Sequence, residues 1–573
     1  MSKNKNFFRF MSLDNQKKNW FDLSHTNSGS CNMGHLVPVL CEPTLPDDYF
    51  SCELSYLIRM AQMVAPPMTR IGVNFFAFDC PNRILMDSRK WDKFLADIDN
   101  TTGIELPVLS FTPIYNVLSS YSQSEEFANS LRSYLLPYDS SVSVHQNGDY
   151  IDIEYYELDT NKYDGGVLVR DFFDTKFNKS PFVGTLLDFF GFPVDSPLMR
   201  VQYSDFNLDD SDEYSYTLRP LSRMTPQRSF QVLPMLAYLY IWNEYFRQEF
   251  IQEEIPEGLL EDFNDFKQRL DFDPSILWTL KRRDWEHDYF TSCLPSPQLG
   301  ESASIEIGQD GKFTIPELRE ANAIQKIREK LLHGGSRVWE ILANFFGSEV
   351  SDARIQIPQY IRPEPGTGQS WLRISDIYQT APGASDSFPT LSADANIAAP
   401  RGASVNTNRI GLKFKHKCKE HGYIIVLMNI QPEPVYSQGI PRHFLSLDTL
   451  DLGWPDFANI TEQPVYKYEV YATPDNSRKT QAGDYPVFGY QSQYAWYKFH
   501  NSELHGELRD DLDFFHFGRI FESEPSLNDT FLQCNPSDRP FPIEYEYDKI
   551  TYHIAFNMGV DRKLPYYGVP SLR

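Results

Sequence analysis

Cysteine is scarce in this chain of 573 residues, which has only seven, and they are scattered from Cys31 to Cys534. No two of them form a CxxC pair and their number is odd, so neither a disulfide framework nor a zinc ribbon is indicated. Cys418 and His421 are two possible metal ligands at short spacing, but no second pair accompanies them. We therefore interpret them as a strand thiol and a turn histidine, and we predict reduced thiols, no metal site and no cofactor.

Long apolar runs are also missing. The most apolar stretch, Phe230 to Trp242, is too short to span a bilayer and contains Pro234. The first residues lack the apolar stretch of a signal peptide. We expect a buried segment of a soluble protein and no membrane insertion.

Positive charge is in deficit, because 53 Lys and Arg face 78 Asp and Glu and give a formal net charge of −25. Such a chain repels polyanions at long range, so any contact with nucleic acid must be local or must depend on a basic partner. One local basic stretch near the start is countered only by Asp14 and contains Lys3, Lys5, Arg9, Lys17 and Lys18. This stretch is either a solvated terminus or a contact with phosphate or neighbouring subunits on an inner surface.

Catalytic signatures are absent as well: the chain has no P-loop, dinucleotide fingerprint, GxSxG elbow or HExxH helix. His287 and Asp288 are adjacent, so they point to different sides of a strand, and no nucleophile is placed beside them. The acidic cluster from Asp209 to Glu213 lacks the glycine and spacing of a calcium-binding loop and is interpreted as a solvated loop. No enzymatic activity is predicted, although a glycosidase carboxylate pair would be visible only in three dimensions.

Aromatic side chains and turn formers are abundant, with 42 Phe, 33 Tyr, 9 Trp, 30 Gly and 39 Pro. Many turns favour an all-β protein over a helical bundle. Tyr and Trp suit extensive, wet contact surfaces because each combines an apolar body with a polar tip.

Strand patterns occur near both ends of the chain. The run from Gly72 to Phe78 indicates a strand buried on both faces, and alternation around Asn147-Gly148 indicates a hairpin with a two-residue turn. Further strands are predicted at His421–Ile430, Tyr466–Ala472, Val487–Phe499 and Ile550–Phe556.

Helices are fewer. Thr314 and Glu317 form a capping-box pattern that begins a helix ending at Gly334, and a second helix starts at Val338 and stops before Gly347.

These elements predict a mainly β fold: an eight-stranded antiparallel jelly roll with long inserted loops and a few short helices. Residues 1–30 are predicted to form an extended basic arm on an inner face. Residues 31–573 are predicted to form a single domain with insertions at about 97–228 and 295–410. The stretch 363–410 is rich in small and polar residues, and we expect neighbouring subunits to order it.

Several stretches, in the same order along the chain, resemble the major capsid proteins of gokushovirus-like Microviridae. They are Met33–Val39, Phe75–Arg83, Leu233–Arg247, His287–Pro295, Glu420–Ile425, Tyr436–Gly439, Val487–Gln491 and Pro565–Leu572. The resemblance implies a T=1 icosahedral shell of sixty copies around a circular single-stranded DNA genome. It also implies a small basic DNA-binding protein, a minor or pilot protein and a host surface receptor as partners, with assembly in the host cytoplasm and residence in the virion.

The sequence departs from this family in two places. The gap between Pro297 and Thr314 is short where gokushoviruses carry a threefold protrusion, and the region 97–228 is expanded instead. Two other functions stay open: a carbohydrate-active β-sandwich enzyme or lectin, and a receptor-binding spike. Facing carboxylates across an aromatic cleft would favour the first, whereas a repeated fibrous segment, which is not seen, would favour the second.

Overall fold

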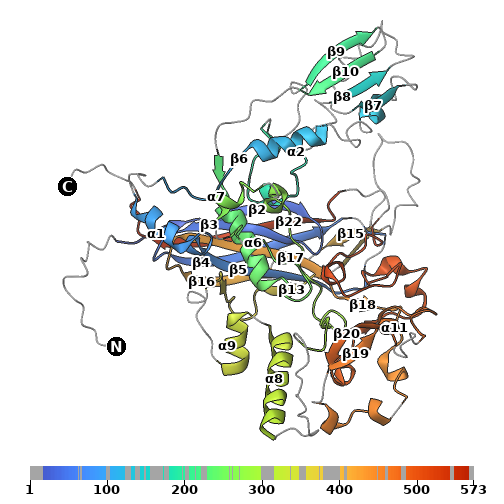
Figure 1. Cartoon of the computed structure of the whole chain (residues 1–573). Helices are drawn as coiled ribbons and strands as arrows, with labels where there is room; N and C mark the ends of the chain where they lie inside the picture. The colour runs from blue at the N-terminus through green and yellow to red at the C-terminus, as the bar shows by residue number, and fades with distance from the viewer. Residues whose placement is uncertain are drawn as a thin grey trace, which may run out of the picture. The chain divides into compact units, whose positions relative to one another are not determined.

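The computed structural model is mainly β, with antiparallel sheets and short helices, as predicted (Figure 1). It describes residues 17–61, 63–64, 67–97, 103–122, 131–135, 142–147, 150–154, 172, 180–196, 198–199, 206–212, 215–220, 229–256, 258–260, 262–269, 272–298, 315–335, 337–347, 356–372, 375–378, 400–404, 409–447, 449–458, 462–478, 485–541 and 547–566. The chain divides into two compact units. The first comprises Met1–Ile84, Tyr240–Ile255 and Lys281–Arg573, and the second comprises Leu85–Leu239 and Pro256–Leu280.

One sheet of the first unit joins the two ends of the chain. Its strand order is β1-β22-β4-β16, and β2 also pairs with β22. The strands are β1 (Asn19–Asp22), β2 (His25–Cys31), β4 (Tyr49–Met60), β16 (Arg409–Lys417) and β22 (Ile550–Arg562). Buried and more exposed residues alternate along β4 and most of β22, so this sheet presents one apolar face and one solvated face.

The second sheet of this unit has the order β12-β5-β17-β3, with β13 also on β5. Its strands are β3 (Leu36–Thr44), β5 (Ile71–Pro81), β12 (Gln359–Ile361), β13 (Gln369–Trp371) and β17 (Gly422–Pro432). Every residue of β17 is buried, and β5 is buried along nearly its whole length. The prediction of strands at 72–78 and 421–430 is thus confirmed.

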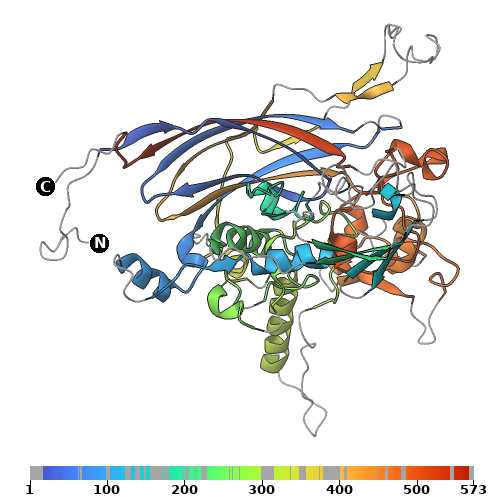
Figure 2. The ribbon, with the colours of Figure 1, turned by 90° about the horizontal axis from the view of Figure 1, so that it is seen from above.

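The two sheets of the first unit pack face to face, as Figure 2 shows. The Tyr56 ring on β4 lies 5.4 Å from the Phe75 ring on β5, measured between centroids. Tyr56 Oη and Ser370 Oγ, on β13, are 2.5 Å apart and share a buried hydrogen bond. The apolar core therefore lies between the sheets, with this polar link inside it.

The predicted helices are present. The helix α8 (Ile315–Gly334) ends at the predicted glycine, while Thr314 lies outside the described residues. The helix α9 (Val338–Phe346) is followed by Gly347, whose φ of 61° is the left-handed conformation that glycine adopts without strain. The apolar stretch at 230–242 forms most of α6 (Leu233–Tyr245) and is buried as expected. Among the described residues, no helix is long and apolar enough to cross a membrane.

Two strand predictions need correction. The strand β19 (Glu462–Tyr466) stops where the strand 466–472 was expected to begin, and α11 (Lys467–Val470) follows. The reason is a local cap, because the Tyr466 backbone N–H donates to Glu469 Oε1 at 2.9 Å. Likewise β20 (Val487–Ser492) ends early, and a 3₁₀ turn, Ala495–Tyr497, replaces the rest of the expected strand.

The second unit carries a four-stranded sheet of order β7-β8-β10-β9. The predicted hairpin is confirmed, but Asn147 pairs with Tyr150, so residues 148 and 149 connect the strands instead of 147 and 148. The acidic residues 209–212 lie in β9 and not in the loop that we expected. The elements of this unit are α1 (Ser88–Ala96), β6 (Val108–Ser110), α2 (Thr112–Ser122), β7 (Ser143–Asn147), β8 (Tyr150–Glu154), α5 (Leu186–Phe189), β9 (Phe206–Asp212), β10 (Ser215–Pro220), β11 (Ser229–Gln231) and α7 (Phe263–Phe266).

Short elements complete the first unit. They are β14 (Ser375–Tyr378), β15 (Pro400–Ser404), β18 (Val435–Tyr436), β21 (Ser502–Glu503) and α12 (Asp529–Leu532). The long connection between β17 and β22 holds most of the surface features described next.

Candidate assembly and nucleic-acid surfaces

Three lysines converge on one carboxylate at an end of the first sheet. Asp47, in the turn between β3 and β4, contacts Lys18, Lys417 and Lys563. The Nζ atoms lie 3.2, 2.5 and 3.0 Å from Asp47 carboxylate oxygens, in that order. Lys417, Lys563 and Lys18, the strongest first, hold the pKa of Asp47 well below its usual range. We call these four residues the Asp47 cluster, and its formal charge is +2.

Chain topology brings the Asp47 cluster together. Lys18 precedes β1, Lys417 ends β16 and Lys563 follows β22, and these strands belong to one sheet. Sequence reasoning selected Lys18 but missed Lys417 and Lys563, because their proximity depends on strand pairing across hundreds of residues. Lys17 is exposed beside the cluster in sequence, and Lys3, Lys5 and Arg9 lie outside the described residues.

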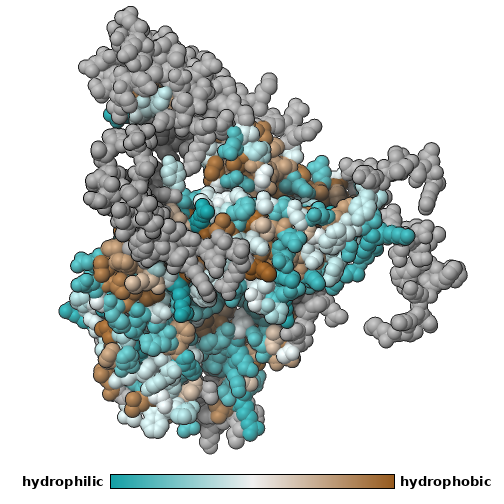
Figure 3. Space-filling model, turned by 180° about the vertical axis from the view of Figure 1, so that it is seen from behind, coloured by the Kyte–Doolittle hydropathy of each residue, from teal (hydrophilic) through white to brown (hydrophobic). Residues whose placement is uncertain are grey.

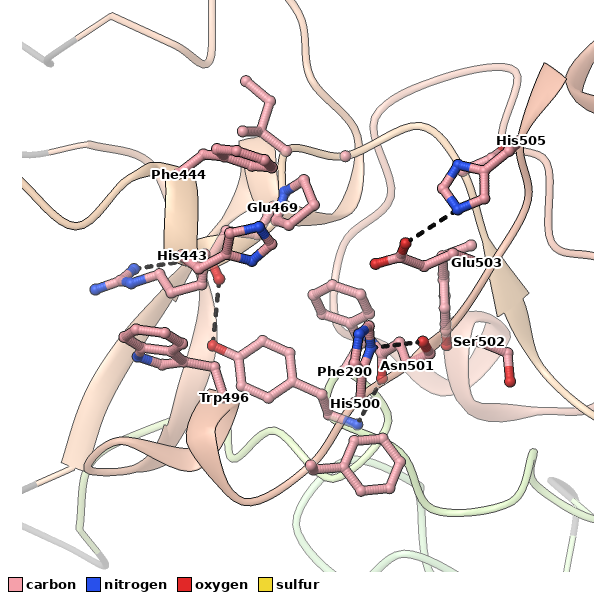
Figure 4. Close-up of a pocket in the computed structure, with 18 of the residues that line it drawn as sticks. Phe290, His443, Phe444, Glu469, Trp496, His500, Asn501, Ser502, Glu503 and His505 are labelled. Atoms are coloured by element: carbon pink, nitrogen blue, oxygen red, sulfur yellow. Dashed lines mark hydrogen bonds and ion pairs between the residues drawn. The ribbon is translucent and has the colours of Figure 1, made fainter. Parts of the chain in front are cut away.

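An aromatic pocket of about 580 Å³ opens in the connection between β17 and β22 (Figure 4). Its lining includes Phe290, His443, Phe444, Trp496 and His505. The wall combines apolar rings with imidazoles and two carboxylates, so it is suited to bind an amphipathic group.

The two carboxylates are Glu469 and Glu503, and Glu469, the more buried one, already has hydrogen-bond partners within the protein. Glu469 accepts hydrogen bonds from Arg442 Nη1 at 2.7 Å and, at 3.2 Å, from the Tyr289 hydroxyl. Burial raises the pKa of Glu469, and the guanidinium of Arg442 opposes that rise. At the other side Glu503 pairs with His505 at 3.3 Å. Glu469 therefore acts as a structural anchor, which disfavours the glycosidase alternative.

His287 and Asp288 do not form a catalytic pair. Asp288 Oδ1 accepts from the backbone N–H groups of Phe290 and Thr291 at 2.8 and 2.7 Å. Its Oδ2 accepts from the Tyr436 hydroxyl at 2.6 Å. The carboxylate thus fixes the turn 288–291 to β18, and burial lowers the pKa of His287.

Large apolar side chains are exposed in the segment between β18 and β19. We call this segment the 440–457 surface, and its exposed members are Ile440, Phe444, Leu447, Leu452, Trp454 and Phe457. Leu447 is 87% exposed and Phe444 is 69% exposed. Apolar patches also interrupt the hydrophilic surface seen from behind (Figure 3). So many exposed apolar side chains in one short segment are typical of a protein–protein interface.

Comparison with known proteins gives one consistent result. The family model described as capsid protein (F protein) matches residues 13–121, 221–314 and 308–572. The chain is 25% identical to capsid protein VP1 of Chlamydia phage 1, over 99% of this chain and 98% of that protein. It is 24% identical to capsid protein VP1 of Bdellovibrio phage phiMH2K, with 96% and 95% covered. For capsid protein VP1 of Spiroplasma virus 4 the identity is 22%, with 96% and 94% covered.

The family matches leave out residues 122–220, most of the region that we interpreted as expanded. Elsewhere they include the basic stretch from residue 13, both sheets of the first unit and the 440–457 surface. The resemblance to Microviridae capsid proteins is confirmed, and with it a structural role in the virion. The chain belongs to the capsid protein (F protein) family.

Proposed function

We propose that sixty copies of this chain form a T=1 icosahedral shell around a circular single-stranded DNA genome, assembling in the host cytoplasm. The observation that carries this proposal is membership of the capsid family, together with similarity to capsid protein VP1 of Chlamydia phage 1 over 99% of the chain.

The order of strand pairing supports an eight-stranded jelly roll. In that fold one sheet has strands one, eight, three and six, and the other has five, four, seven and two, in these orders. Counting β1 with β2 as the first strand and β12 with β13 as the fifth, the order β1-β22-β4-β16 fits the first sheet. The order β12-β5-β17-β3 fits the second. The segments between these strands then become the loops that meet neighbouring subunits.

The 440–457 surface is the part of the chain that we propose to be buried between copies. Replacing both Phe444 and Leu447 by Ser removes two of its most exposed apolar side chains without touching the core. We expect the variant to fold but not to form shells, as seen by sedimentation. Val183→Ser, which removes an exposed apolar side chain of the second unit, serves as the control and leaves assembly unchanged.

The Asp47 cluster and the basic residues before it, 1–17, are proposed to face the genome. Because the chain carries a net charge of −25, a small basic DNA-binding protein is needed to neutralise the remaining phosphates. We further propose a minor or pilot protein and a host surface receptor as partners. The region 97–228 is proposed as an insertion on the outer surface of the single capsid domain.

Removing positive charge from the Asp47 cluster tests the genome contact. Lys417→Gln with Lys563→Gln should lower DNA content per shell and weaken the salt dependence of DNA binding, because fewer counterions are released. Lys93→Gln, at an exposed lysine of α1, is the matched control. If the Lys417→Gln, Lys563→Gln double variant and the Lys93→Gln control contain equal amounts of DNA, the Asp47 cluster does not contact the genome.

Negative-stain microscopy tests the main proposal. The protein is expressed alone and together with its small basic partner, and uniform closed shells of about 4 MDa, sixty copies of 66.5 kDa, are expected. Monomers under every condition would contradict the proposal. Removal of residues 1–18 should reduce genome content, and unchanged assembly and DNA content would exclude a role for the basic arm.

A further inference from the structure

Three donor atoms of different chemistry meet between the two sheets of the first unit. Asp79 lies on β5, His416 lies on β16, and Cys418 directly follows β16. One carboxylate oxygen, one imidazole nitrogen and the thiol sulfur all lie within 4.8 Å of one another. His416 Nε2 and Asp79 Oδ2 are 2.7 Å apart. The group links the two layers of the fold across their interface.

The three side chains are well shielded from solvent. Cys418 is completely buried, and the side chains of Asp79 and His416 are 9% and 11% exposed. Burial, together with the charges of Asp79 and Asp48, raises the pKa of the Cys418 thiol well above its usual range.

A second buried carboxylate, Asp48, lies next to the group and is paired with an arginine. Asp48 is 1% exposed, and its backbone oxygen accepts from the Cys418 N–H at 2.9 Å. Asp48 Oδ2 accepts from Arg562 Nε at 2.8 Å, whereas Oδ1 has no hydrogen-bond partner among the described residues. Because Arg562 balances the charge of Asp48, this carboxylate leaves the formal charge of the group unchanged.

We propose that Asp79, His416 and Cys418 bind a zinc ion, with water completing the coordination. Sulfur, imidazole nitrogen and carboxylate oxygen are the donors that zinc takes in proteins. One thiolate and one carboxylate balance the double charge of the ion, so the buried site is formally neutral. In tetrahedral zinc sites a nitrogen and an oxygen lie about 3.4 Å apart, so the 2.7 Å contact must open by about 0.7 Å.

The sequence spacing pointed to a different histidine. In the sequence, the histidine spaced like a metal ligand from Cys418 is His421, and we interpreted that pair as not forming a metal site. The structure agrees that His421 is not a member of the group. His416 is a member instead, because residues two apart along an extended chain point to the same side. Asp79 joins them only through the packing of β5 against β16.

Metal analysis of intact shells tests the proposal. After dialysis against a weak chelator, we expect about one zinc per chain in the unmodified protein, and a small fraction of that in His416→Ala and Cys418→Ser. His421→Ala and Cys534→Ser are the matched controls, because Cys534 is equally buried outside the group, and both should retain the metal. Zinc removal should also lower the unfolding temperature of the unmodified protein and leave that of His416→Ala unchanged.

Cobalt substitution of the unmodified protein gives a readout that needs no variant. Thiolate-to-cobalt charge-transfer absorption is expected if Cys418 is a ligand. A cobalt spectrum without that absorption would overturn the proposal, as would unmodified shells without zinc. Zinc retained by both His416→Ala and Cys418→Ser would do the same. In those cases His416 and Asp79 form a hydrogen bond between the sheets and nothing more.

Discussion

Glu469 and Arg442 show how a single buried pair can organise a pocket wall. Their side chains are 2% and 9% exposed, and the pair also receives the Tyr289 hydroxyl and the Tyr466 backbone N–H. Each group compensates the charge of the other, so neither is easily removed alone.

We expect Glu469→Ala to destabilise the chain by about 3–5 kcal/mol, because Arg442 is then buried without its partner. Urea unfolding of the isolated chain measures this loss. Glu503→Ala is the control from the same pocket: its partner His505 is largely exposed, and such pairs contribute at most about 1 kcal/mol. Equal effects of the two variants would contradict this view of Glu469.

Asp284 predicts a pH effect of definite sign. Burial, with a smaller contribution from Asp529, raises the pKa of Asp284 from 3.8 to about 7, while its bond from Gln252 opposes the rise. The folded chain therefore binds more protons than the unfolded chain between these values, so stability falls as the pH rises from about 4 to 7.

Asp284→Asn introduces a side chain of the same shape that stays uncharged at every pH. The variant should therefore not lose folding stability as the pH rises. At pH 8 we expect a gain of up to about 4 kcal/mol over the unmodified chain, and almost none at pH 4. Unfolding free energies at both pH values measure it, with Asp538→Asn, whose carboxylate is 72% exposed, as the control. A gain that does not depend on pH would contradict the proposed protonation of Asp284.

At the residue scale the sequence predicted little of the candidate sites. Lys18 was selected by local charge, but Lys417 and Lys563 join it only through strand pairing. Similarly, His416 and Cys418 share a side of an extended segment, yet nothing in their spacing indicates Asp79, which is 337 residues away from His416.

Secondary-structure elements were more predictable, because apolar patterns are local. The continuous apolar runs of β5 and β17 identified two central strands, and glycines located the ends of α8 and α9. The strand predicted at 466–472 was wrong, because the apolar pattern of this segment does not reveal that the Glu469 carboxylate caps a helical turn there.

The pairing of β17 with β5 depends on a close backbone approach. A Cβ on Gly422 would lie 2.3 Å from the Cys80 carbonyl oxygen, whereas one on Gly72 would meet nothing closer than 3.6 Å. We expect Gly422→Ala to destabilise the chain by about 1–3 kcal/mol, since backbone cannot move aside. Gly72→Ala, in the neighbouring strand, should change urea stability by less than this. Similar urea-unfolding midpoints for Gly422→Ala and Gly72→Ala would show that β17 and β5 can move apart at Gly422.

At the scale of the whole molecule, the seven cysteines are free in the structure, and all except the partly buried Cys41 are buried. We expect native shells to react slowly with a thiol reagent and the denatured chain to react at all seven positions. Rapid reaction of several native thiols would indicate that the core opens readily.

The first sheet is completed by both ends of the chain, since β1 and β2 lie against β22. The nascent polypeptide therefore cannot complete this sheet until β22, the last of its strands to be synthesised, is free to pair. Until β22 pairs, β4 has only one of its two neighbours, β16, and its other edge stays open. We therefore expect a product truncated before β22 to keep one edge of β4 unpaired and to be prone to aggregation.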